Sequence, residues 1–104
     1  MIIFRKMAIS AVYITIDTME NASRLAGGLV QARLAACVNI IPGVRSVYMW
    51  EGQVHDDAEL LLMVKTKTGL VPNLTQWVKE NHPYDCPEVI SVPITEVTRR
   101  ILSL

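Results

Sequence analysis

The chain has 104 residues, 51% of them hydrophobic, and a mean hydropathy of +0.31. This length is typical of one domain, so we predict a single domain over residues 1–104. No uninterrupted apolar run is longer than Leu60–Val64, far short of the ~18 residues that a membrane-spanning helix requires. Ten basic and ten acidic residues are interspersed, which argues against binding to nucleic acid. The apolar excess instead predicts burial between copies of the chain.

The two cysteines cannot form a disulfide framework, which indicates a reducing compartment, and we expect the cytoplasm. Residues 1–9 are interpreted as a leader, with Met7 as an alternative start. Their basic residues follow the apolar ones, which is not the order of a secretory signal.

The first part of the chain predicts a strand followed by a helix. Ala11–Ile16 is rich in β-branched and aromatic residues, which favours a strand. Asp17 and Thr18 then offer N-cap oxygens, with Glu20 three residues after Asp17 in a capping-box arrangement. An apolar stripe at helical spacing follows, made of Ala22, Leu25, Ala26, Leu29, Val30 and Leu34. Gly27–Gly28 within this helix predicts a close approach of two backbones.

The middle of the chain predicts two further strands. The segments come in the order strand Ala36–Ile41, bend Pro42–Gly43, continued strand Val44–Trp50 and turn Glu51–Gly52. After the polar stretch 53–57, the nearly continuous apolar segment Ala58–Lys65 predicts a central strand buried on both faces.

The last part predicts a second helix and an edge strand. The helix opens at Thr68 and Gly69 and ends at Asn81–His82, because Pro83 restricts the residue before it. Its apolar stripe is Leu70, Leu74, Trp77 and Val78. In the following strand, Glu88–Ile94, Pro93 lacks an amide donor and therefore favours a sheet edge. For 95–104 we expect a short helix.

Strand–helix–strand–strand–helix–strand is the order of an α+β ferredoxin-like sandwich, with an antiparallel sheet and both helices on one face. Such a sheet leaves its other face uncovered. Because the chain is rich in apolar residues, we expect that face to pack against neighbouring subunits, in a number that the pattern does not fix.

Three segments, Leu34–Gly43, Ser46–Gly52 and His82–Glu88, together resemble the CutA divalent-ion tolerance family, with the Leu62–Thr66 strand in its expected place between them. The resemblance covers roughly residues 11–94, and residues 95–104 diverge from it. It implies a ferredoxin-like subunit, a tight homotrimer, and a role in binding copper or other divalent ions and in metal tolerance.

Four residues are candidate metal ligands. Cys37 as a thiolate and His82 as an imidazole suit copper or zinc, and Glu59 or Glu88 would complete a site. Because Cys37 and His82 are far apart in the sequence, such a site requires tertiary or intersubunit contacts. Two other interpretations stay open: Cys37 as a small buried strand residue, and His82 as a cap bonding a free carbonyl at its helix end.

The resemblance also places Trp50, Glu51, Lys65 and Tyr84 near the cleft between subunits, where a small ligand or ion would bind. Packing in the core or in an interface is the alternative role for these residues. Lys65 is further predicted to form a pair with Glu51 or Glu88.

Three functions follow from these features. The first is a trimeric metal-binding or metal-responsive protein, and the second is a trimeric scaffold that presents loops to another protein without physiological metal. The third, an acylphosphatase-like enzyme, is disfavoured because residues 17–20 form an acidic loop without glycine that repels phosphate. We therefore expect no enzyme activity and name no catalytic residue.

Overall fold

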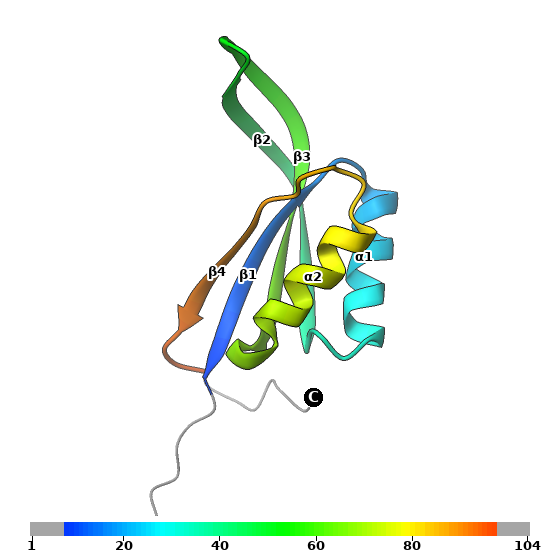
Figure 1. Ribbon diagram of the computed structural model, residues 1–104, viewed down its shortest axis with the longest axis vertical. Coiled ribbons are helices and arrows are strands. Elements are labelled where there is room, and N and C mark those ends of the chain that lie inside the picture. Colours follow the sequence, from blue (N-terminus) through cyan, green and yellow to red (C-terminus); the bar gives the residue numbers. More distant parts are fainter. Residues whose placement is uncertain (1–7, 98–104) are drawn as a thin grey trace, which may run out of the picture.

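The computed structural model describes residues 8–97 and confirms the α+β ferredoxin-like fold. A four-stranded antiparallel sheet in the order β2-β3-β1-β4 carries both helices on one face (Figure 1). The elements are β1 Ile9–Ile16, α1 Met19–Gln31, β2 Cys37–Trp50, β3 Gln53–Lys67, a 3₁₀ turn Thr68–Leu70, α2 Val71–Asn81 and β4 Val89–Ile94. Ile9, the last residue of the interpreted leader, is the first of β1, and residues 1–7 and 98–104 lie outside the described part.

The hydrophobic core lies between the helices and one face of the sheet. Antiparallel pairing of β1 with β3 aligns Val12 with Val64 and Ile14 with Leu62, all fully buried. Since alternate strand residues point to opposite faces, these pairs share the helix side of the sheet. The helices supply the other half of the core, chiefly Ala22, Leu25, Leu29, Leu74 and Val78.

The structure corrects two expectations about β3. Burial alternates along it, so that Leu60, Leu62 and Val64 are buried, whereas Leu61 and Met63 are only half-buried in the described chain. The expectation of burial on both faces was therefore wrong, because the helices cover only one. The polar stretch 53–57 is also part of β3, which begins at Gln53 directly after the turn.

The sheet face opposite the helices, here the open face, is largely apolar. The register places Tyr13 beside both Met63 and Ile90, and Ile90 and Val92 of β4 are 47% and 39% exposed. β4 forms one edge of the sheet, as Pro93 predicted. No element in the described part of the chain covers this face (Figure 1).

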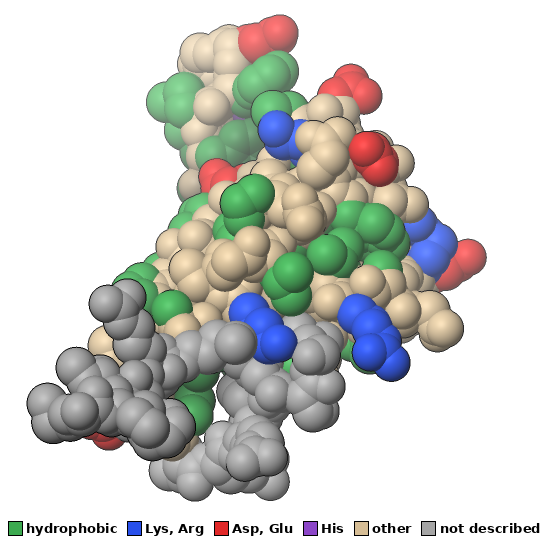
Figure 2. Space-filling model, turned by 60° about the horizontal axis from the view of Figure 1, so that its bottom comes forward, with side chains coloured by type: hydrophobic (Ala, Val, Ile, Leu, Met, Phe, Trp, Pro, Cys, Tyr) green, Lys and Arg blue, Asp and Glu red, His purple; other side chains and the backbone are tan. Residues whose placement is uncertain are grey.

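The β2–β3 hairpin projects beyond the body as an arm, which we define as residues 44–59 (Figure 1). Trp50 pairs with Gln53, so Glu51 and Gly52 form a two-residue turn, with φ of 49° and 77°. Positive φ at both positions is the type I′ geometry that matches strand twist. The arm carries exposed hydrophobic side chains (Figure 2), namely Val47, Tyr48, Met49, Trp50 and Val54.

Helix α1 is capped by one of the two predicted residues, but without the predicted capping box. The N-cap is Thr18, whose hydroxyl accepts the amide proton of Asn21 at 3.1 Å. Asp17 instead accepts the side-chain amide of Asn21 at 2.9 Å, so the predicted capping box of Asp17 and Glu20 does not form.

The close approach predicted at the glycine pair exists at Gly28 alone. A methyl group on Gly28 would lie 2.5 Å from Cη2 of Trp77 in α2, whereas nothing lies within 4 Å of the same position on Gly27. The partner is therefore an indole ring and not a second backbone, which corrects the expectation.

Gly28→Ala should lower the free energy of unfolding by about 1–3 kcal/mol, because the indole of Trp77 must shift out of its packing position. Gly27→Ala is the matched control and should raise it by up to ~1 kcal/mol through helix propensity. Urea unfolding of both variants measures the difference. Equal effects of the same sign would contradict this account of the helix contact.

Candidate functional site

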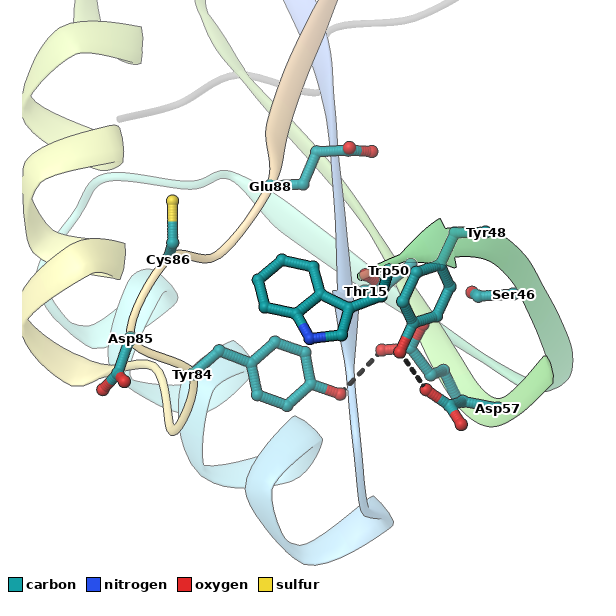
Figure 3. A pocket seen from close by; sticks show the side chains of 10 residues that line it. Thr15, Ser46, Tyr48, Trp50, Asp57, Tyr84, Asp85, Cys86 and Glu88 are labelled. Atoms are coloured by element: carbon teal, nitrogen blue, oxygen red, sulfur yellow. Dashed lines mark hydrogen bonds between the residues drawn. The ribbon is translucent and has the colours of Figure 1, made fainter. Parts of the chain in front are cut away.

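A pocket of about 720 Å³ opens where the arm meets the body (Figure 3). Four of its ten lining residues are acidic and none is Lys, Arg or His. The lining comes from β1, the arm, and the segment between α2 and β4, and consists of Thr15, Ser46, Tyr48, Trp50, Asp57, Glu59, Tyr84, Asp85, Cys86 and Glu88. We refer to it below as the arm pocket.

A β-bulge places the arm side chains in this pocket. Ile41 pairs with Leu61 and Val44 with Glu59, so Pro42 and Gly43 together oppose the single residue Leu60. Gly43 has a φ of 80°, which suits glycine, and Pro42 lacks the amide that an unbroken ladder would need. Because a one-residue shift exchanges the two faces of a strand, the bulge moves the even-numbered residues in the β2 half of the arm to the open-face side. Of these, Ser46, Tyr48 and Trp50 line the pocket.

Two tyrosine hydroxyls bind carboxylates inside the arm pocket. Tyr84 Oη donates to Glu59 Oε2 at 2.6 Å, and Tyr48 Oη donates to Asp57 Oδ2 (Figure 3). Tyr48 also stacks on His55, with ring centroids 5.4 Å apart. Ionised carboxylates only accept hydrogen bonds, so each of these two retains free acceptor capacity toward the pocket.

The pKa of the Tyr84 hydroxyl is raised well above its usual value. Burial is the largest cause, followed by the hydrogen bond to Glu59 and the negative charges of Glu59, Asp17 and Asp57. The pKa of Tyr48 is raised as well, mainly by its hydrogen bond to Asp57. Both shifts report an environment that disfavours additional negative charge.

His82 lies beneath Tyr84 and is only 8% exposed. Its Nδ1 accepts the amide proton of Tyr84 at 3.0 Å, so Nε2 carries the ring proton and donates to the Thr15 carbonyl at 2.8 Å. Both ring nitrogens are thus engaged, and a metal ion would have to displace one of these bonds. The ring ties the α2–β4 segment to β1.

His82 is the C-cap of α2, as one of the two interpretations had it, but through its backbone amide, which donates to the Val78 carbonyl at 2.8 Å. Its ring bonds a carbonyl of β1 and none of its own helix. Arg24 instead donates two N–H groups to the Asn81 carbonyl, each at 3.2 Å, and the Asn81 side chain donates to the Trp77 carbonyl at 2.8 Å.

Cys37 lies away from the arm pocket. Cys37 pairs with Lys65 on β3, and Lys65 pairs with Ala11 on β1. The half-buried Cys37 thiol donates a hydrogen bond to the Asn39 side chain at 3.9 Å. Ala11 is four residues from Thr15 on β1, about 13 Å along a strand. Within one chain Cys37 and His82 therefore cannot share an ion. Across residues 8–97, no three His, Cys, Asp or Glu side chains are arranged to hold a metal ion.

The predicted cleft residues divide into two groups. Trp50 and Tyr84 line the arm pocket together with Glu59 and Glu88, whereas Glu51 occupies the exposed tip of the arm. Lys65 lies half-buried on the open face, and no ion pair joins it to Glu51 or Glu88 in the described part of the chain. Within residues 8–97 of one chain, the predicted Lys65 pair does not form. The other six lining residues, which were not predicted as site residues, are Asp57, Tyr48, Ser46, Thr15, Asp85 and Cys86.

The fold and pocket together define a class: ferredoxin-like α+β domains with a projecting β2–β3 arm and an acidic, aromatic pocket at its base. The sequence profile described as CutA1 divalent ion tolerance protein matches residues 10–103. The chain belongs to the CutA1 divalent ion tolerance family, which confirms the resemblance. This description names ion tolerance and no enzyme activity.

Individual relatives agree with this assignment. "Protein CutA 1, chloroplastic" of Oryza sativa is 55% identical over 83 residues, 80% of this chain and 47% of the relative. The Thermus thermophilus divalent-cation tolerance protein CutA is 50% identical over 91 residues, 88% of each chain. The crystal structure of CutA1 from Oryza sativa superposes with a TM-score of 0.88 at 49% identity, covering 91% of this chain and 87% of that one.

The chain spans about half the length of the plant relatives, with 47% and 46% coverage, but most of the Thermus protein. Neither helix within residues 8–97 is long and apolar enough to cross a membrane.

The raised pKa of Tyr84 predicts a dependence of stability on alkaline pH. A tyrosine whose pKa is higher in the folded state stabilises the fold below its unfolded value of ~10, and this contribution is lost as the pH rises further. The free energy of unfolding should therefore fall more steeply above pH ~10 in the unmodified chain than in Tyr84→Phe. Denaturant unfolding across that range measures both slopes, and parallel curves would contradict the assignment.

Proposed function

We propose that the chain forms a homotrimer that binds divalent cations, copper among them, and contributes in this way to metal-ion tolerance and the response to metal ion. The observation that carries ion binding is the lining of the arm pocket, with four carboxylates and no basic side chain. Carboxylate oxygens are common ligands for divalent cations. The family description and the names of the relatives support the role in tolerance.

Of the four predicted ligands, we assign Glu59 and Glu88 to the ion. Both line the arm pocket, and Glu59 has accepted only one described hydrogen bond, from Tyr84. The thiol of Cys86, a soft donor, lines the same pocket. Because no three His, Cys, Asp or Glu side chains within residues 8–97 are arranged to hold an ion, the remaining ligands would come from another copy of the chain or from water. Cys37 and His82 have no part in this assignment, because one lies elsewhere on the sheet and the other has both nitrogens bonded.

Assembly is supported by the open face. Its apolar side chains have no covering layer in the described chain, and β4 adds Ile90 and Val92 at the edge. Burying apolar area is worth roughly 25 cal/mol per Å², so copies that cover this face gain stability. The uncovered apolar face favours a partner surface without fixing the number of copies, and three subunits follow from the resemblance to the family.

Ile90→Asp should break the assembly, since it buries a charge in the proposed interface. Val30→Asp is the matched control: Val30 is 45% exposed on α1, against 47% for Ile90, but lies on the helix side of the molecule. Light scattering after size exclusion should give about three times 11.6 kDa for the unmodified chain and for Val30→Asp. Ile90→Asp should elute as a single chain, and an unchanged mass would refute the interface.

The double variant Glu59→Gln, Glu88→Gln should weaken binding of Cu²⁺ or Zn²⁺ by at least ~10-fold, because it removes the assigned ligands. Glu20→Gln with Glu96→Gln removes the same charge from two exposed positions outside the pocket and should leave the affinity unchanged. Isothermal titration of the assembled protein measures both. Saturable binding that is equal in the two double variants would place the ion elsewhere.

A scaffold without physiological metal is the second candidate. Val47, Met49 and Val54 lie on the side of the arm away from the pocket and are 65%, 65% and 69% exposed. An exposed apolar strip of this kind suits a protein partner. Absence of saturable Cu²⁺ and Zn²⁺ binding would favour this alternative over the first.

We also propose a cytoplasmic location. Cys37 and Cys86 are both free thiols, which supports a reducing compartment. The names of the rice and Arabidopsis relatives give the chloroplast, and the Archaeoglobus fulgidus structure is described as periplasmic. Fractionation of cells that express the native gene tests this proposal.

A further inference from the structure

We propose that the arm pocket also binds a linear aliphatic diamine in its diammonium form. Its methylene chain would lie against the rings of Trp50 and Tyr84, with the ammonium groups on carboxylates at the two sides of the pocket. This ligand class goes beyond divalent metal ions and rests on the aromatic residues of the lining, which metal binding does not use.

The hydrogen-bonding character of the lining selects for cations. The hydroxyl protons of Tyr48 and Tyr84 are already donated to Asp57 and Glu59, so the charged groups of the pocket present only acceptors to a ligand. No lining residue carries positive charge. An ammonium group supplies N–H donors and charge together, and an anion would find neither a counter-charge nor a charged donor.

The aromatic lining distinguishes an organic cation from a bare metal ion. Trp50 is 60% exposed in the single chain, and its indole stands between Glu88 and Tyr84 in the view of Figure 3. Cations attached to alkyl chains gain both from the ring quadrupole and from burial of their methylenes against the ring face. Tyr48 adds a third ring to the same lining.

Two groups of carboxylates match two charged ends. Asp57 and Glu59 come from β3, whereas Asp85 and Glu88 come from the segment between α2 and β4. The volume of about 720 Å³ leaves room for a chain of several methylenes. After burial and the hydrogen bond to Glu59, the charges of Glu59 and Asp57 also raise the pKa of Tyr84, which agrees with a negative potential in the pocket.

The test is isothermal titration of the full chain with putrescine (diaminobutane) at low ionic strength, in a buffer containing a metal chelator. Butylamine and butanediol serve as the singly charged and uncharged probes of the same length. We expect saturable binding of putrescine, weaker binding of butylamine and none of butanediol. Trp50→Ala should weaken putrescine binding by about 2- to 30-fold, the range of a cation–π contact.

Met49→Ala is the matched control, since Met49 precedes Trp50, is 65% exposed and lies outside the pocket lining. Because Trp50 lies on the arm, Glu88→Gln is the second variant and should also weaken putrescine binding. No saturable putrescine binding, binding of butanediol as tight as that of putrescine, or equal affinities in Trp50→Ala, Glu88→Gln and Met49→Ala would overturn the proposal. The chelator keeps this result independent of whether Cu²⁺ or Zn²⁺ binds.

Discussion

The structure depends on one constraint: two helices can cover only one face of a four-stranded sheet. The register of β1 with β3 directs Val12, Ile14, Leu62 and Val64 into the helix layer, where they are fully buried. The same alternation must direct their neighbours to the open face. An apolar sequence therefore completes its core and still leaves apolar surface, which is the physical basis of the proposed assembly.

The position of the pocket depends on a second, local feature. At the Pro42–Gly43 bulge, two residues of β2 oppose one of β3. Without it, Tyr48 and Trp50 would lie on the other side of the arm, away from Glu59. The bulge also increases local twist. His82 holds the α2–β4 segment, which forms the opposite side of the pocket, because its ring bonds both the Thr15 carbonyl of β1 and the amide of Tyr84. One bulge and one buried imidazole thus bring the arm and the α2–β4 segment together.

The order of elements and the edge position of β4 could be predicted from the sequence, because strand and helix periodicity, Pro83 and Pro93 are local signals. The start of β3 could also have been predicted from the two-residue turn. Such a turn pairs the residues on either side of it, Trp50 with Gln53, and therefore also Tyr48 with His55. The contact of Gly28 with Trp77 could not be predicted from the sequence, because it depends on how two helices cross. The Thr15 carbonyl as partner of His82 likewise depends on tertiary packing, and so does the separation of Cys37 from His82.

The central claim is that the open face is covered by further copies of the chain. Small-angle X-ray scattering of the unmodified protein across a dilution series tests it most directly, because the forward intensity gives the particle mass without a label or a variant. The account predicts a mass near three times 11.6 kDa that stays constant on dilution. A particle of 11.6 kDa that remains well dispersed at all concentrations would contradict it.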